Sequence, residues 1–159
     1  ENTCREEEEE MKKIGEYTVK GQLTTSDSSS EKIQLFDGSF GTGYRVTSLV
    51  IRLGDRDDSG IEVASVKLST IPITDNTDWN WALNTEIGWA SCGHDANGLS
   101  TQSPEATIDP DNMIVEDLYI GGYSHTDAEL VNYMITMEKY DISDWQGALA
   151  MVRNKAQNV

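Results

Sequence analysis

The segment Leu130–Tyr140, with the sequence LVNYMITMEKY, decides the fold class. Its apolar residues recur at every second position, namely Val131, Tyr133, Ile135 and Met137, with Asn132, Thr136 and Glu138 on the alternate positions. Successive side chains of a strand point to opposite faces of a sheet, so this pattern predicts a strand with one face in a core.

The same period of two recurs along most of the chain. It predicts further strands around Tyr17, Val19 and Leu23, over Lys32–Phe36, around Leu49, Ile51 and Leu53, and over Ile61–Thr70, Glu86–Ala90 and Met113–Gly121. Residues rich in Gly, Ser and Asp at 26–30, 37–43 and 54–60 predict turns between them. We therefore expect an all-β protein with seven or eight antiparallel strands in a two-sheet, jelly-roll-like sandwich.

The C-terminal residues follow a different period. Ser143 followed by Gln146 is a capping box, and Trp145, Leu149 and Val152 recur at helical spacing. This pattern predicts an amphipathic helix over 144–157 whose apolar stripe covers either the end of its own sandwich or a neighbouring subunit. Trp145, Leu149 and Val152 are the expected assembly residues.

The length of 159 residues suits one main domain. We divide the chain into an acidic segment at 1–13, a sandwich domain at 14–142 and the helix at 143–159. Glu6–Glu10 just before Met11 fits either a leader upstream of a native start at Met11 or an acidic interaction arm.

Charge and composition exclude several classes of partner. The chain carries 12 basic and 28 acidic residues, a net charge of −16, which disfavours direct binding to nucleic acid. Its apolar stretches are too short to span a membrane as a helix, and no export signal is indicated. Cys4 and Cys92 are too few and too far apart for a disulfide framework or a structural zinc site, so both are expected to be free thiols.

Two patterns raise chemical hypotheses that simpler interpretations outweigh. Asp55, Asp57 and Ser59 follow the order of a calcium loop, but Val66 stands where that loop needs a glutamate, which favours a plain hairpin turn. Cys92 and His94 suggest a thiol and a base without an orienting group. We therefore predict no enzymatic activity, no metal and no cofactor, and place His125 in a solvated strand connection.

Three tryptophans, Trp79, Trp81 and Trp89, stand among polar residues in a stretch of loose pattern. Exposed indole rings stack on sugars, and the neighbouring Asp75, Asp78, Asn80 and Asn84 offer hydrogen bonds to hydroxyl groups. The same tryptophans equally suit a core or a subunit contact. A carbohydrate-binding sandwich is thus the alternative functional hypothesis.

Three stretches resemble small structural proteins of marine phages and other environmental viruses. They are DWNWALNTEIGWAS at 78–91, DPDNMIVEDLYIGG at 109–122 and VNYMITMEKYDISDWQGALAMVRNKAQNV at 131–159. The resemblance implies a jelly-roll capsid or capsid-associated protein, found in virions assembled in the host cytoplasm. It implies as partners copies of the same chain and other virion proteins, and it carries no active site.

Overall fold

The computed structural model describes residues 12–36, 38, 41–54, 62–95, 97, 99, 106–125 and 128–142. These residues form eight strands: β1 (Lys12–Thr24), β2 (Glu31–Ile33), β3 (Thr42–Leu53), β4 (Glu62–Ser69), β5 (Glu86–His94), β6 (Thr107–Ile108), β7 (Leu118–Ser124) and β8 (Leu130–Asp141). The predicted helix at 144–157, including Trp145, Leu149 and Val152, lies outside the described residues.

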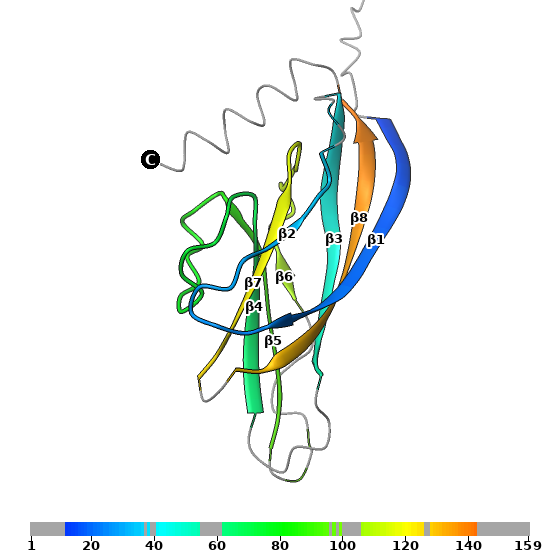
Figure 1. Ribbon diagram of the computed structural model, residues 1–159. Coiled ribbons are helices and arrows are strands. Elements are labelled where there is room, and N and C mark those ends of the chain that lie inside the picture. Colours follow the sequence, from blue (N-terminus) through cyan, green and yellow to red (C-terminus); the bar gives the residue numbers. More distant parts are fainter. Residues whose placement is uncertain are drawn as a thin grey trace, which may run out of the picture.

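The strands make two antiparallel sheets in a sandwich-like arrangement (Figure 1). One sheet has three strands in the order β1-β8-β3, and the other has five in the order β2-β7-β4-β5-β6. The prediction of an all-β protein with two antiparallel sheets is therefore confirmed. No helix among the described residues is long and apolar enough to cross a membrane.

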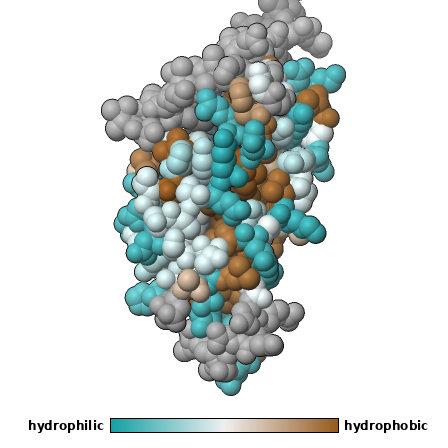
Figure 2. Space-filling view, in the orientation of Figure 1, coloured by the Kyte–Doolittle hydropathy of each residue, from teal (hydrophilic) through white to brown (hydrophobic). Residues whose placement is uncertain are grey.

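The core forms where the alternating apolar residues of the two sheets meet. In the three-stranded sheet, Ile135 of β8 pairs with Val19 of β1 and with Leu49 of β3. Leu68 of β4 and Ile120 of β7 are paired in the five-stranded sheet, and both are fully buried in the same hydrophobic cluster. Figure 2 shows hydrophobic residues gathered along the middle of one face, in the region between the two sheets of Figure 1.

One predicted strand, Lys32–Phe36, is too long. β2 ends at Ile33, and the next backbone groups bond to a side chain instead of a neighbouring strand. The amides of Leu35 and Phe36 donate to Asp117 Oδ1 at 3.0 and 3.3 Å. The prediction failed because a carboxylate distant in the sequence replaces the strand partner.

The predicted strand Met113–Gly121 is divided between the two sheets. Ile114 forms an isolated bridge with Tyr44 of β3, in which each residue's amide donates to the other's carbonyl at 2.8 Å. β7 then begins at Leu118 in the other sheet. The apolar residues keep their even spacing across this division, because both sheets bury their apolar residues in the same core.

Candidate functional site

Residues 70–85 connect β4 to β5 and carry two of the three tryptophans; we call them the tryptophan loop. The amide of Thr70 donates to the carbonyl of Thr85 at 2.8 Å, which closes the loop at its base. Within it, the Asn80 side chain accepts from the amide of Ala82 at 3.0 Å. These contacts give an irregular segment a defined conformation without a strand.

The loop covers the outer face of the five-stranded sheet. On β4, Val66 and Leu68 point into the core, so Lys67 between them points to the opposite face. Lys67 pairs in register with Trp89 of β5. Both residues are buried although neither belongs to the core cluster, because the loop lies over them.

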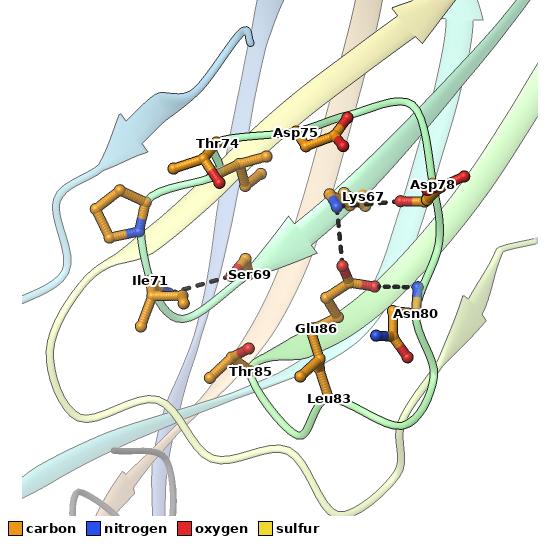
Figure 3. Close-up of a pocket in the computed structure, with 12 residues that line it drawn as sticks. Lys67, Ser69, Ile71, Thr74, Asp75, Asp78, Asn80, Leu83, Thr85 and Glu86 are labelled. Atoms are coloured by element: carbon orange, nitrogen blue, oxygen red, sulfur yellow. Dashed lines mark hydrogen bonds and ion pairs between the residues drawn. The ribbon is translucent and has the colours of Figure 1, made fainter. Parts of the chain in front are cut away.

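An ion pair joins the two strands beneath the loop. Lys67 Nζ lies 2.8 Å from Glu86 Oε1, and each side chain is less than a tenth exposed. Lys67 also donates to the carbonyl of Asp78 at 3.1 Å, and Glu86 Oε2 accepts from the Asn80 amide at 2.8 Å and from Trp89 Nε1 at 3.2 Å. Figure 3 shows the lysine and the glutamate pointing toward one another, with their bonds to the loop backbone. The pair thus fixes the loop to the sheet through both of its charges.

Asn76 provides a second attachment of the loop. Its backbone amide donates to the carbonyl of Asp27 at 2.8 Å, and its side-chain Nδ2 donates to the carbonyl of Ser29 at 2.6 Å. A Cβ at Gly121 of β7 would collide with Asn76 Oδ1 and with the Ser29 carbonyl. Glycine at this position therefore lets the loop and the turn at 26–30 approach the sheet backbone.

A cavity of about 260 Å³, lined by both polar and apolar side chains, opens between the loop and the ends of β4 and β5. Lys67, Asp75, Asp78, Asn80, Thr85 and Glu86 are among its lining residues (Figure 3). Hydrogen bonds from the Thr77 hydroxyl and amide, at 2.6 and 2.8 Å, lower the pKa of Asp75 below its usual value. Asp75 is therefore charged at neutral pH and offers acceptors at the rim of the cavity.

The structure separates the three predicted tryptophans into two roles. Trp89 is 6% exposed and lies under the loop, whereas Trp79 and Trp81 are 42% and 64% exposed. The Trp81 ring lies 5.3 Å from the Trp89 ring between centroids, tilted by 40°. Only Trp79 and Trp81 therefore present surface to a ligand, and Trp89 supports Trp81 from below.

The polar residues proposed beside the tryptophans lie in part at the cavity. Asp75, Asp78 and Asn80 line it, whereas Asn84 is not among the lining residues. Sequence reasoning missed Lys67 and Glu86. A lysine between the apolar positions of a buried strand was the available signal, because such a residue needs a partner.

The thiol and the histidine considered as a catalytic pair are placed in β5. Cys92 is 6% exposed, forms no disulfide with another described residue, and has a pKa raised to about 11 by burial. His94 Nδ1 lies 3.1 Å from the carbonyl oxygen of Asp95, and its buried Nε2 has no partner among the described residues. A thiol with so high a pKa is protonated at neutral pH and is a poor nucleophile.

The remaining site predictions concern a possible calcium loop, the terminal segments and His125. Asp55, Asp57, Ser59, Cys4 and Met11 lie outside the described residues. Within the described ranges, no three His, Cys, Asp or Glu side chains are grouped so as to hold a metal ion. His125 is exposed in a bend directly after β7, as expected.

We find no relative of this chain among known proteins. No family model, no curated protein and no solved structure matches the chain.

Proposed function

We propose that this protein is a virion structural protein, a jelly-roll capsid or capsid-associated component that assembles with copies of itself and with other virion proteins. The observation that carries the proposal is the order in which the strands pair. β1 pairs with β8, β2 with β7, and β4 with β5. The first strand thus meets the last, the second meets the next to last, and the fourth meets the fifth, whereas β6 pairs with β5 and not with β3.

Such nested pairing is what results when one long antiparallel ribbon is wrapped into two sheets, as in a jelly roll. The remaining pair of that pattern would join β3 to the region of β6. The bridge between Tyr44 of β3 and Ile114, which follows β6 closely, supports this fourth pair. Jelly rolls serve as viral capsid domains and as lectins, so the fold narrows the function without deciding it.

Assembly would use the sandwich faces together with the C-terminal helix. Burying Trp145, Leu149 and Val152 against a neighbour would contribute roughly 1.5 to 3 kcal/mol for each side chain before association costs. In a shell of many copies, contacts of this size act together because several neighbours hold each subunit. The net charge of −16 favours contact with protein partners over direct contact with nucleic acid.

The test combines light scattering after size-exclusion chromatography with electron microscopy of the purified chain. We expect defined oligomers or particles, and the loss of every species larger than a dimer when Trp145, Leu149 and Val152 are all changed to Ala. The matched control changes Asn154 and Gln157, which lie off the apolar stripe of the same segment, to Ala. A monomer at every concentration, or equal oligomers in all three proteins, would contradict assembly through this helix.

A second candidate function, carbohydrate binding, is favoured by the tryptophan loop. Trp79 and Trp81 are exposed on the same loop as Asp75, Asp78 and Asn80, which line the cavity, although neither tryptophan lines it. Aromatic faces next to a few placed hydrogen-bonding groups are what a sugar site requires. The site would accordingly bind a neutral glycan, since its rim presents carboxylates that repel acidic sugars.

Titration with a panel of neutral and acidic glycans, followed by tryptophan fluorescence, tests this candidate. We expect a saturable change with neutral glycans that W81A reduces at least about tenfold, as the loss of one stacking residue predicts. L99A is the matched control, because Leu99 is 65% exposed and lies outside the loop. A flat response to every sugar would remove this function and leave the virion proposal standing.

A further inference from the structure

β1 is an edge strand of the three-stranded sheet that the described residues form. It pairs with β8 on one side, and no described strand pairs with its other side. Figure 1 shows β1 as the outermost strand of the three-stranded sheet. Its outer backbone N–H and C=O groups can therefore bond to another strand, which is the usual route to edge-to-edge association.

The central part of this edge is complementary to itself. Residues 15–21 read Gly-Glu-Tyr-Thr-Val-Lys-Gly, a sequence in which an acid and a base, and an aromatic and a β-branched residue, lie symmetrically about Thr18. When two copies of this segment pair antiparallel about a two-fold axis at Thr18, Glu16 of each lies opposite Lys20 of the other. Tyr17 then lies opposite Val19 in the same way. Opposite charges and aromatic–β-branched pairs are the cross-strand combinations that stabilise sheets.

The charged side chains and the aromatic side chain of this segment are exposed and therefore available for such pairing. Glu16 and Lys20 are exposed, and Lys20 has no ionic partner among the described residues. Tyr17 is 50% exposed although it lies on the side of β1 that faces the core, because nothing described covers this edge. Glu16 also contacts Lys13 at 2.9 Å, an exposed pair that contributes little to stability and does not prevent a second partner.

Other registers are less favourable. Moving the axis by one residue places the two-fold at Tyr17 or Val19 and leaves both charges without opposite partners. Moving it by two residues places Glu16 opposite Glu16 or Lys20 opposite Lys20, which repel. A two-fold at Ile14 would also place Glu16 opposite a base, Lys12, but it would join only residues 12–16 of β1, whereas the two-fold at Thr18 joins the whole strand. The charges together with the length of the paired segment therefore favour the register centred on Thr18.

We propose that β1 binds β1 of a second copy of this chain, antiparallel and centred on Thr18, so that two three-stranded sheets become one continuous sheet. The interface is isologous, as most dimer interfaces are. It rests on β1 alone and does not require the virion role or the C-terminal helix.

A charge swap tests the register in the full-length chain by sedimentation velocity. We expect a concentration-dependent dimer, which E16K or K20E weakens at least about tenfold because each creates two like-charge pairs. The double variant E16K/K20E restores opposite pairs and should dimerise within about threefold of the original chain. The control E31K makes the same charge change on β2, outside the proposed interface, and should leave the dimer intact.

Cysteine cross-linking gives an independent measurement in a Cys4→Ser background. Thr18→Cys places two thiols opposite each other at the axis and should form a disulfide dimer on mild oxidation. Thr136, the partner of Thr18 on β8, lies in the same row one strand further from the axis, so Thr136→Cys should not cross-link. A monomer at all concentrations, a double variant as weak as the single variants, or equal cross-linking at both positions would each overturn the proposal. Circular dichroism confirms that every variant is folded.

Discussion

Lys67 and Glu86 form a buried ion pair, 2.8 Å between Nζ and Oε1, on the side of the five-stranded sheet that faces away from the core. Burying two charges is costly unless both are paired and hydrogen-bonded, and here the loop backbone supplies the additional bonds. The pair therefore couples the position of the tryptophan loop to the integrity of the sheet. Trp79 and Trp81 depend on this coupling, because they project from the segment that the pair holds.

Glu86→Ala should destabilise the protein by about 3 to 5 kcal/mol, because it leaves Lys67 as a buried charge without a carboxylate. The double variant K67M/E86L, which removes both charges, should lose much less. Urea unfolding followed by circular dichroism measures both free energies. A loss in the double variant as large as that in Glu86→Ala would show that the cost does not come from an unpaired buried charge.

Gly121→Ala should cost roughly 1 to 3 kcal/mol of unfolding free energy, because its methyl group would collide with Asn76 and with the Ser29 carbonyl. Gly15→Ala is the control, since a Cβ there meets no atom within 4 Å. Thermal unfolding of the two variants provides the comparison. Equal changes in melting temperature would mean that the loop is not held against β7 as described.

Stability should respond to acid through Asp117. Burial raises the pKa of Asp117, but bonds from Lys32 and from the amides of Phe36 and Leu35 outweigh it and lower the pKa below 3.8 overall. The folded state thus favours the carboxylate, so its contribution is present above about pH 4 and is lost as pH falls through the lowered pKa. Asp117→Asn should cost about 1 to 2 kcal/mol at pH 7 and progressively less toward pH 2. A loss independent of pH would show that charge at this position is immaterial.

Stability should also fall in alkali through Cys92. Burial raises its pKa from 9.0 to about 11 in the folded chain, whereas the unfolded thiol ionises near the lower value. The folded state therefore favours the protonated thiol, and this contribution is complete below pH 9 and lost between about pH 9 and 11. Cys92→Ala should flatten that part of the stability curve even though it lowers the whole curve. In a Cys4→Ser background, alkylation of Cys92 by iodoacetamide at pH 8 should correspondingly be much slower in the native protein than in urea.

The sequence by itself determined the strands that alternate strictly. Leu130–Tyr140 was recognised because every second residue of β8 from Val131 to Met137 is buried. Where the pattern failed, a contact distant in the sequence was responsible. Phe36 leaves the strand because Asp117 binds its amide, and Ile114 joins the other sheet because Tyr44 pairs with it. The local spacing of apolar residues predicts neither Asp117 nor Tyr44 as a partner.

The candidate site divides in the same way. Composition alone drew attention to Trp79 and Trp81, since tryptophans among Asp and Asn are unusual in a loop. Only the tertiary structure decided that Trp89 lies beneath them, that Lys67 and Glu86 meet, and that Gly121 makes room for Asn76. The physical reason is that periodicity reports which face of a strand is apolar, whereas buried polar pairs depend on which strands become neighbours, and that is fixed by packing across the whole chain.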